Sequence, residues 1–143
     1  MKINIKRINK DVPLPKHEST GSVGVDLHAA QDMVVKSKEI ILVPSGLIIE
    51  VPKGYMLVIA PRSSTPGKTG LSFPHSIGII DQDFCGPEDE IMIQVYNFTD
   101  NDVLVKKGDR IAQGIFVKIE TAVWEEIDSM DHNKTRGKFG STG

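Results

Sequence analysis

Proline and glycine interrupt this chain so often that no regular element can be long. The chain has 143 residues, of which 13 are glycine and 8 are proline. The prolines lie between or at the ends of short apolar runs, at positions 13, 15, 44, 52, 61, 66, 74 and 87. Proline is poorly tolerated inside helices and in central strands. The sequence therefore predicts short elements joined by turns, and long helices are almost excluded.

The apolar runs between these interruptions have the pattern of β-strands. Residues 90–98 alternate, which places Ile91, Ile93 and Val95 on one face and Gln94 and Tyr96 on the other. The other expected strands are residues 2–5, 42–43, 47–51, 55–60, 103–105, 111–119 with an interruption at Gly114, and 123–124. Many short strands separated by turn signals are typical of an all-β sandwich or barrel.

Helical structure is expected in two short segments. Residues 63–68 predict a single turn that Ser63 or Ser64 caps and that tolerates Pro66. Residues 125–130 are a second candidate. Residues 132–143 contain no apolar side chain except Phe139, which predicts a mobile tail after a domain of residues 1–131.

Length and cysteine content indicate a single domain in a reducing compartment. At this length folding buries roughly 68–70% of the surface that the unfolded chain exposes, so neither disulfides nor a structural metal is needed. The single cysteine, Cys85, cannot pair within the chain. No apolar run approaches the ~20 residues that span a bilayer, and the alternating first six residues do not resemble a secretion signal. We expect a cytoplasmic protein, or one of the host cytoplasm if it is viral, with no membrane partner.

Charge and motif spacing exclude several functions. A formal net charge of −2 argues against a protein that binds nucleic acid through broad electrostatic attraction. Residues 67–69 resemble the end of a P-loop, but the first glycine of that motif would fall at Arg62. A calcium loop that starts at Asp81 would require glutamate where the chain has Met92. The histidines are far apart and there is one cysteine, which argues against a zinc site.

The remaining polar segments each allow a structural and a functional interpretation. Arg62, Ser63 and Ser64 at the start of a helical turn offer donors for an anion, but in isolation the segment favours an N-cap next to a salt bridge. Asp81, which follows an apolar run, is either a turn former at a hairpin or a general base. The same choice holds for Asp26, for residues 109–110 and for Gln113. The tail is either a frayed terminus or a lid that orders over a ligand.

Five segments in this order resemble the five motifs of the trimeric, all-β dUTP pyrophosphatases (dUTPases), and the resemblance covers residues 24–143. The segments are Gly24-Val25-Asp26-Leu27-His28-Ala29, Pro61-Arg62-Ser63-Ser64 continuing to Gly70-Leu71, Gly78-Ile79-Ile80-Asp81-Gln82-Asp83-Phe84-Cys85-Gly86, Gly108-Asp109-Arg110-Ile111-Ala112-Gln113, and Arg136-Gly137-Lys138-Phe139-Gly140-Ser141-Thr142-Gly143. The resemblance implies a dUTPase-like β-barrel or jelly-roll-like domain.

The resemblance also implies an activity, namely Mg²⁺-dependent hydrolysis of dUTP to dUMP and pyrophosphate. This reaction keeps uracil out of DNA and supplies dUMP for thymidylate synthesis. Asp81 matches the general base that activates water for attack on the α-phosphate, and Asp26 matches the carboxylate that holds Mg²⁺ through water. The phosphate-contacting positions are matched by Arg62, Ser63, Ser64, Gln113 and Arg136.

Base and sugar recognition are implied for the third and fifth segments. The matching residues are Gly78, Ile79, Ile80, Phe84, Phe139 and Gly140, with His75 as a further pocket residue where many relatives have asparagine. The chain departs from the family pattern at Phe84, where tyrosine is usual, and at an insertion of residues 87–89. Arg136 and Phe139 are also closer in sequence than usual, so Lys134 is an alternative cation for the γ-phosphate. The family architecture implies a homotrimer with shared sites.

Two other functions remain open at this stage. A dCTP deaminase, monofunctional or bifunctional, shares the fold but typically has a glutamate-centred site and a longer chain. A regulator that binds a nucleotide or a partner protein without catalysis would also fit an all-β domain.

Overall fold

The computed structural model describes residues 1–131 and residue 137, and its regular structure is almost entirely β. The elements are β1 (Ile5–Arg7), β2 (Val25–His28), β3 (Met33–Val35), β4 (Ile40–Pro44), β5 (Leu47–Ile49), β6 (Tyr55–Ala60), α1 (Thr65–Thr69), β7 (Leu71–Ser72), β8 (Gly78–Ile80), β9 (Met92–Asn97), β10 (Val103–Val105) and β11 (Arg110–Lys118). The predicted all-β class is confirmed, and α1 overlaps residues 63–68, for which a helical turn was predicted, and extends one residue beyond them.

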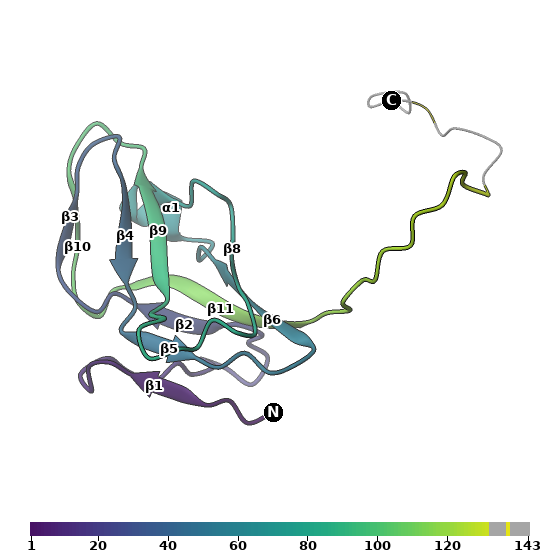
Figure 1. Cartoon of the computed structure of the whole chain (residues 1–143). Helices are drawn as coiled ribbons and strands as arrows, with labels where there is room; N and C mark the ends of the chain where they lie inside the picture. The colour runs from purple at the N-terminus through teal and green to yellow at the C-terminus, as the bar shows by residue number, and fades with distance from the viewer. Residues whose placement is uncertain (132–136, 138–143) are drawn as a thin grey trace.

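The strands form four antiparallel sheets around one apolar core. A four-stranded sheet has the order β2-β11-β6-β8, a three-stranded sheet has the order β4-β9-β7, and β1-β5 and β10-β3 are two-stranded. In Figure 1, β4 and β9 stand above the layer that contains β2, β11 and β6. Leu27, Leu57 and Ile93, from three of these strands, are almost fully buried in the core. The four-stranded sheet carries the candidate site.

The strands with the clearest sequence patterns form as predicted. Ile93 and Val95 of β9, and Ile91 just before it, are at most 1% exposed, whereas Gln94 and Tyr96 on the other face are partly exposed. β11 continues through Gly114 without interruption. A side chain at Gly114 would place its Cβ 3.2 Å from Cδ1 of Leu57, so glycine allows β11 to approach β6 closely.

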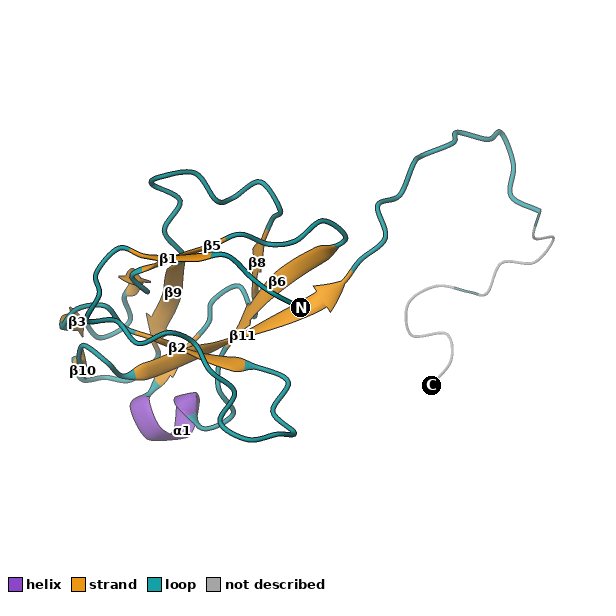
Figure 2. Ribbon diagram, turned by 90° about the horizontal axis from the view of Figure 1, so that it is seen from below, coloured by secondary structure: helices purple, strands orange, loops and turns teal. Residues whose placement is uncertain are grey.

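Residues 119–131 leave the body of the fold after β11, and we call this segment the arm (Figure 1). The predictions of a strand at residues 123–124 and a helix at residues 125–130 are wrong. Figure 2 shows the arm extending away from the sheets. Val123 and Trp124 are 94% and 93% exposed within the described chain. Residues 123–130 are exposed among the described residues, and a short segment without packing partners gains too little to form a helix or a strand ladder.

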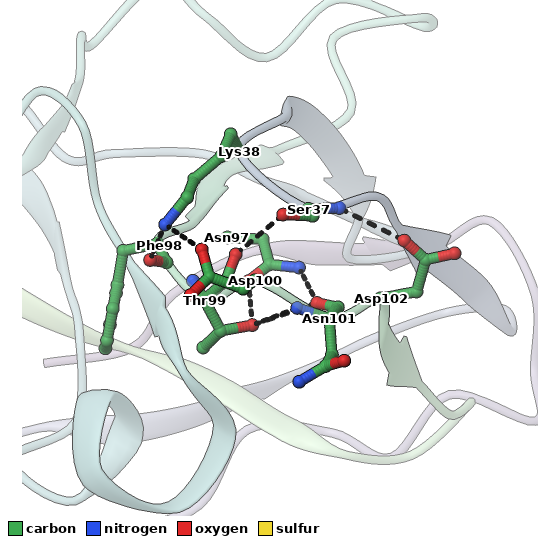
Figure 3. Close-up of polar contacts among 8 residues, drawn as sticks. All are labelled: Ser37, Lys38, Asn97, Phe98, Thr99, Asp100, Asn101 and Asp102. Carbon is green, nitrogen blue, oxygen red and sulfur yellow. Dashed lines mark hydrogen bonds and ion pairs between the residues drawn. The ribbon is translucent and has the colours of Figure 1, made fainter.

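A buried asparagine braces the turn after β9, as Figure 3 shows. Asn97 is fully buried, and its Nδ2 donates to the carbonyl oxygens of Val35 (2.9 Å) and Asn101 (2.8 Å). Its Oδ1 accepts hydrogen bonds from the backbone N–H and the hydroxyl of Thr99. The next amide, Phe98 N–H, donates to the carbonyl of Gly70 at the end of α1. The network therefore fixes the helical turn that follows Arg62.

Candidate functional site

A surface cavity of about 240 Å³ brings together residues from three separate sequence segments. Five of the predicted site residues line it, namely Asp26, Arg62, Ser63, Ser64 and Gln113. The remaining wall comes from the loop before β2 and includes Glu18, Ser22 and Gly24.

Strand β11 lies between β2 and β6 and positions the cavity residues that these strands carry. Gln113 of β11 pairs with Asp26 of β2 on one side and with Ala60 of β6 on the other. Its amide Nε2 donates to the carbonyl of Pro61 at 3.1 Å. A side chain at Gly24 would place its Cβ 2.8 Å from Oε1 of Gln113, so glycine at this position leaves space for the amide. Gln113 thereby joins the end of β6 to the start of β2.

Asp26 forms ion pairs with two arginines at this site. Its side chain is only 9% exposed, and its Oδ1 lies 2.9 Å from Nε of Arg62. Its Oδ2 accepts a hydrogen bond from Nη1 of Arg110 at 3.2 Å. Each arginine uses a single nitrogen for this contact, so most of the guanidinium donors remain available. The carboxylate thus holds two cations next to the cavity.

The short helix α1 places the two serines. Ser64 is its N-cap residue but makes no side-chain capping hydrogen bond within the described chain, and proline follows in the first turn. The backbone amide of Thr65 donates to the carbonyl of Arg62 at 2.9 Å. The structural interpretation therefore holds in part, because Ser64 occupies the N-cap position and Arg62 forms an ion pair with Asp26. The anion-binding interpretation stays a prediction.

His28 adds a titratable group to the same face of the sheet. It lies two residues after Asp26 and pairs with Arg110 of β11. Burial lowers the pKa of His28, and the positive charges of Arg110 and Arg62 act in the same direction against the opposing carboxylates of Asp26 and Glu18. Burial at this position therefore disfavours the protonated, positively charged form of His28.

Asp81 and its neighbours lie elsewhere in the chain's own fold. Asp81 is exposed directly after β8, which pairs with β6 at the edge of the four-stranded sheet. It does not belong to a hairpin, because β8 does not pair with β9. Phe84 is 37% exposed, and Ile80 packs against the core while Ile79 is half-exposed. His75 stacks on Phe73 with ring centroids 6.0 Å apart.

The register of β8 separates Asp81 from the cavity. Ile80 pairs with Leu57, so Asp81 continues toward the beginning of β6, whereas Arg62 follows the end of β6. Six residues separate the position opposite Asp81 from Arg62, which at 3.3 Å per residue corresponds to roughly 20 Å. One chain therefore does not bring Asp81 to its own Arg62.

Sequence reasoning missed Glu18 and Ser22 and did not give a specific role to Arg110 or His28. The first two lie in a turn-like stretch with no chemical signature, whereas Arg110 lies in a segment that was already recognised as unusual. The predicted contacts of Arg136, Phe139 and Gly140, and the alternative at Lys134, fall outside the described residues. The insertion at residues 87–89 forms a tight turn in which Asp89 accepts a hydrogen bond from the amide of Gly86 at 2.6 Å.

No group of three or more histidine, cysteine, aspartate or glutamate side chains that could hold a metal ion occurs in the described part of the chain. Asp26 is the predicted contact to Mg²⁺ through water. A carboxylate has about four acceptor sites, and the two arginines occupy two of them, so Asp26 can still accept a metal-bound water. In the same described residues, no helix has the length and apolarity needed to cross a bilayer.

Fold and cavity together define a small all-β domain whose polar site offers the guanidinium of Arg62 and serine hydroxyls as donors to an anion. The dUTPase family model matches residues 10–143. This chain belongs to the dUTPase family.

Individual relatives agree with this assignment. The deoxyuridine 5'-triphosphate nucleotidohydrolase of Finegoldia magna is 38% identical, with 99% of each chain covered. The protein of the same name from Hydrogenobaculum sp. is 37% identical and covers 100% of this chain and 99% of its own. The crystal structure of dUTPase from Streptococcus mutans superposes with a TM-score of 0.77 at 31% identity, covering 84% of this chain and 98% of the other.

Proposed function

We propose that the protein hydrolyses dUTP to dUMP and pyrophosphate, and that the cavity at Asp26 binds the triphosphate. The observation that carries the proposal is the arrangement of Arg62, whose Nε is fixed by Asp26 while its side chain lines a cavity with two serine hydroxyls and Gln113. Guanidinium and hydroxyl groups donate charge-assisted hydrogen bonds to phosphate oxygens. Family membership supports the same assignment.

The fixed donors suit transition-state stabilisation. Charge accumulates on the phosphate oxygens as water attacks the α-phosphorus, and donors held in place beforehand stabilise that charge without reorganising. Arg62 is oriented by Asp26, and Gln113 is oriented by the carbonyl of Pro61. We therefore assign substrate positioning and charge stabilisation to Arg62, Ser63, Ser64 and Gln113.

Asp81 is proposed as the general base, acting in a site formed with another subunit. Its carboxylate is exposed, and the register of β8 separates it by roughly 20 Å from Arg62 of its own chain. A general base must lie within hydrogen-bond distance of the attacking water. A homotrimer in which one subunit contributes Arg62 and a second contributes Asp81 meets this requirement.

Exposed apolar surface supports such an assembly. A groove of about 450 Å³ is lined mainly by apolar residues that include Ile3, Leu14, Val23 and Phe116. The arm carries further exposed apolar side chains, of which Trp124 is the largest. Soluble monomers rarely expose contiguous apolar patches of this kind. These surfaces are suited to contacts between subunits.

The edge of β8 is the proposed site for uracil. An edge strand presents unpaired backbone N–H and C=O groups, and uracil carries an N3–H donor between two carbonyl acceptors. Gly78 lacks a side chain that would obstruct this approach, and His75 lies close to it, because a Cβ at Gly78 would be 3.6 Å from Nε2 of His75. Ile79, Ile80 and Phe84 complete the proposed base and sugar pocket.

Mg²⁺ is the proposed cofactor, held through water by Asp26. When bound to the substrate phosphates it supplies charge neutralisation. The remaining acceptor sites of the Asp26 carboxylate support this role.

We propose residues 132–143 as a lid of the domain formed by residues 1–131. Arg136, with Lys134 as the alternative, would contact the γ-phosphate, and Phe139 and Gly140 would cover the base. The free, exposed thiol of Cys85 suits a reducing compartment, and we propose a cytoplasmic location.

Substrate profiling tests the proposed function. The purified full chain is incubated with Mg²⁺ and, separately, with dUTP, dCTP, dTTP and UTP. The expected result is pyrophosphate from dUTP alone. Ammonia released from dCTP would replace the proposal with a deaminase, and the absence of turnover with all four nucleotides would replace it with a non-catalytic binder.

A further inference from the structure

A β-bulge places Arg110 on the same face of the sheet as the proposed phosphate ligands. In the pairing of β11 with β2, Arg110 lies opposite His28 and Ala112 lies opposite Leu27, so β11 contains one extra residue at Ile111. Alternate residues of a strand share a face. Without the extra residue, Arg110 and Gln113 would point to opposite faces. With it, both lie on the face that carries Asp26.

Arg110 and Arg62 contact different oxygens of the Asp26 carboxylate. Arg110 Nη1 donates to Oδ2 of Asp26, and Arg62 Nε lies next to Oδ1. The two oxygens therefore have separate partners, and the contact from Arg110 favours one orientation of the carboxylate. Arg62 reaches Asp26 through Nε only, which leaves both terminal nitrogens of its guanidinium for the cavity that it lines.

We propose that Arg110 is a positioning residue that acts on the triphosphate through Asp26 and Arg62. It orients the carboxylate, the carboxylate orients Nε of Arg62, and the terminal nitrogens of Arg62 bind phosphate. Arg110 itself does not line the cavity. The inference rests on the proposed binding of the triphosphate at Arg62 and adds a residue behind that site.

A double-mutant cycle distinguishes this chain of contacts from a direct contact. Binding of inorganic tripolyphosphate is measured calorimetrically without Mg²⁺, whose binding would also depend on Asp26, for the full-length wild type, Arg62→Gln, Arg110→Met and the double variant. Arg110→Met should weaken binding about tenfold, which corresponds to the loss of one charge-assisted hydrogen bond. In the double variant, binding should match that of Arg62→Gln within about twofold, because Arg110 acts only through Arg62.

Controls separate positioning from folding. Lys107→Met removes an exposed ion pair with Asp11, 3.1 Å long and close to Arg110 in sequence, and should bind like the wild type. Arg110→Lys should recover most of the affinity, since the contact to Asp26 uses one nitrogen. If Arg110→Met does not fold, Arg110→Gln takes its place in the cycle.

Three results would overturn the inference: unchanged binding by Arg110→Met, multiplicative losses in the double variant, or Arg110→Lys binding as weakly as Arg110→Met. Failure of the proposed function is a separate outcome. In that case the wild type would neither bind tripolyphosphate nor hydrolyse dUTP.

Discussion

Nε of Arg62 lies 2.9 Å from Oδ1 of Asp26, which joins the turn after β6 to the strand β2. Replacing Asp26 with asparagine removes the charge between two guanidinium groups and turns an amide N–H toward one of them. We expect kcat/KM for dUTP to fall at least about tenfold and the free energy of unfolding to fall by about 1–2 kcal/mol, since both arginines are partly exposed. Steady-state kinetics and urea denaturation measure the two effects.

Asp11→Asn is the matched control for this substitution. Asp11 pairs with Lys107 at the surface, where its side chain is 70% exposed. Its loss should change stability by less than about 0.5 kcal/mol and leave kcat/KM unaltered. Equal effects of the two substitutions would contradict the role given to Asp26.

His28 makes stability depend on pH in a defined direction. Burial lowers its pKa, so the native protein binds fewer protons than the unfolded chain in the range below the ordinary value of 6.5. Protonation of His28 therefore lowers the free energy of unfolding as pH falls below 6.5. Well above pH 6.5, His28 is neutral in both states and has no such effect. His28→Gln should lose less stability than the wild type between about pH 7.5 and about pH 5. Urea midpoints at each pH measure the difference, and identical slopes for both proteins would refute it.

Mixing two inactive variants tests the shared site. Asp81→Asn should lower kcat about 10²–10⁴-fold while dUTP still binds, because the variant lacks the general base. Arg62→Gln should be impaired in phosphate binding. After joint refolding at equal amounts, each mixed trimer has one site in three that combines an intact Arg62 with an intact Asp81 from another subunit, which is about one quarter of all sites when assembly is random. Recovery of turnover toward that fraction is expected.

The matched control refolds each variant alone and mixes them without exchange of subunits, which should recover no activity. If joint refolding also recovers none although mixed trimers are present, each subunit contains its own complete site.

Removal of residues 136–143 tests the lid. Turnover of dUTP should fall at least about tenfold, because the proposed phosphate cation and the aromatic cover are lost. The thermal midpoint should remain within about 2 °C of the wild-type value, since the described core does not include these residues. Unaltered kinetics would sink the lid proposal, and a large drop in the midpoint would show that these residues stabilise the fold instead.

Sequence patterns predicted the strands that carry enough residues to show a period. β6 and β9 are six residues each; β9 forms where the alternation of residues 90–98 indicated, and β6 forms where the apolar run of residues 55–60 indicated. β2, β3, β7 and β8 were not predicted as strands; each has only two to four residues, and their stability comes from pairing with distant strands. β10 is equally short but was predicted from its apolar run of residues 103–105. At residues 123–130 the apolar pattern was present, but the described chain offers it nothing to pack against.

The sequence predicted which residues form the site, but not the contacts between them. Asp26, Arg62 and Gln113 were selected individually, and the cavity does join them. The link from Arg110 to Asp26 depends on a bulge at Ile111, and no property of an isoleucine in an apolar strand signals an extra residue. The separation of Asp81 from Arg62 depends on the register of β8, which is set by a long-range pairing.

The arm contains the only tryptophan of the chain, and that makes it an optical probe. Trp124 is 93% exposed when the chain is considered alone, so its fluorescence reports the solvent contact of the arm without interference from the core. A shift of the emission maximum to shorter wavelength as protein concentration rises would show that Trp124 becomes buried against another subunit. Assembly could then be followed in solution without any label.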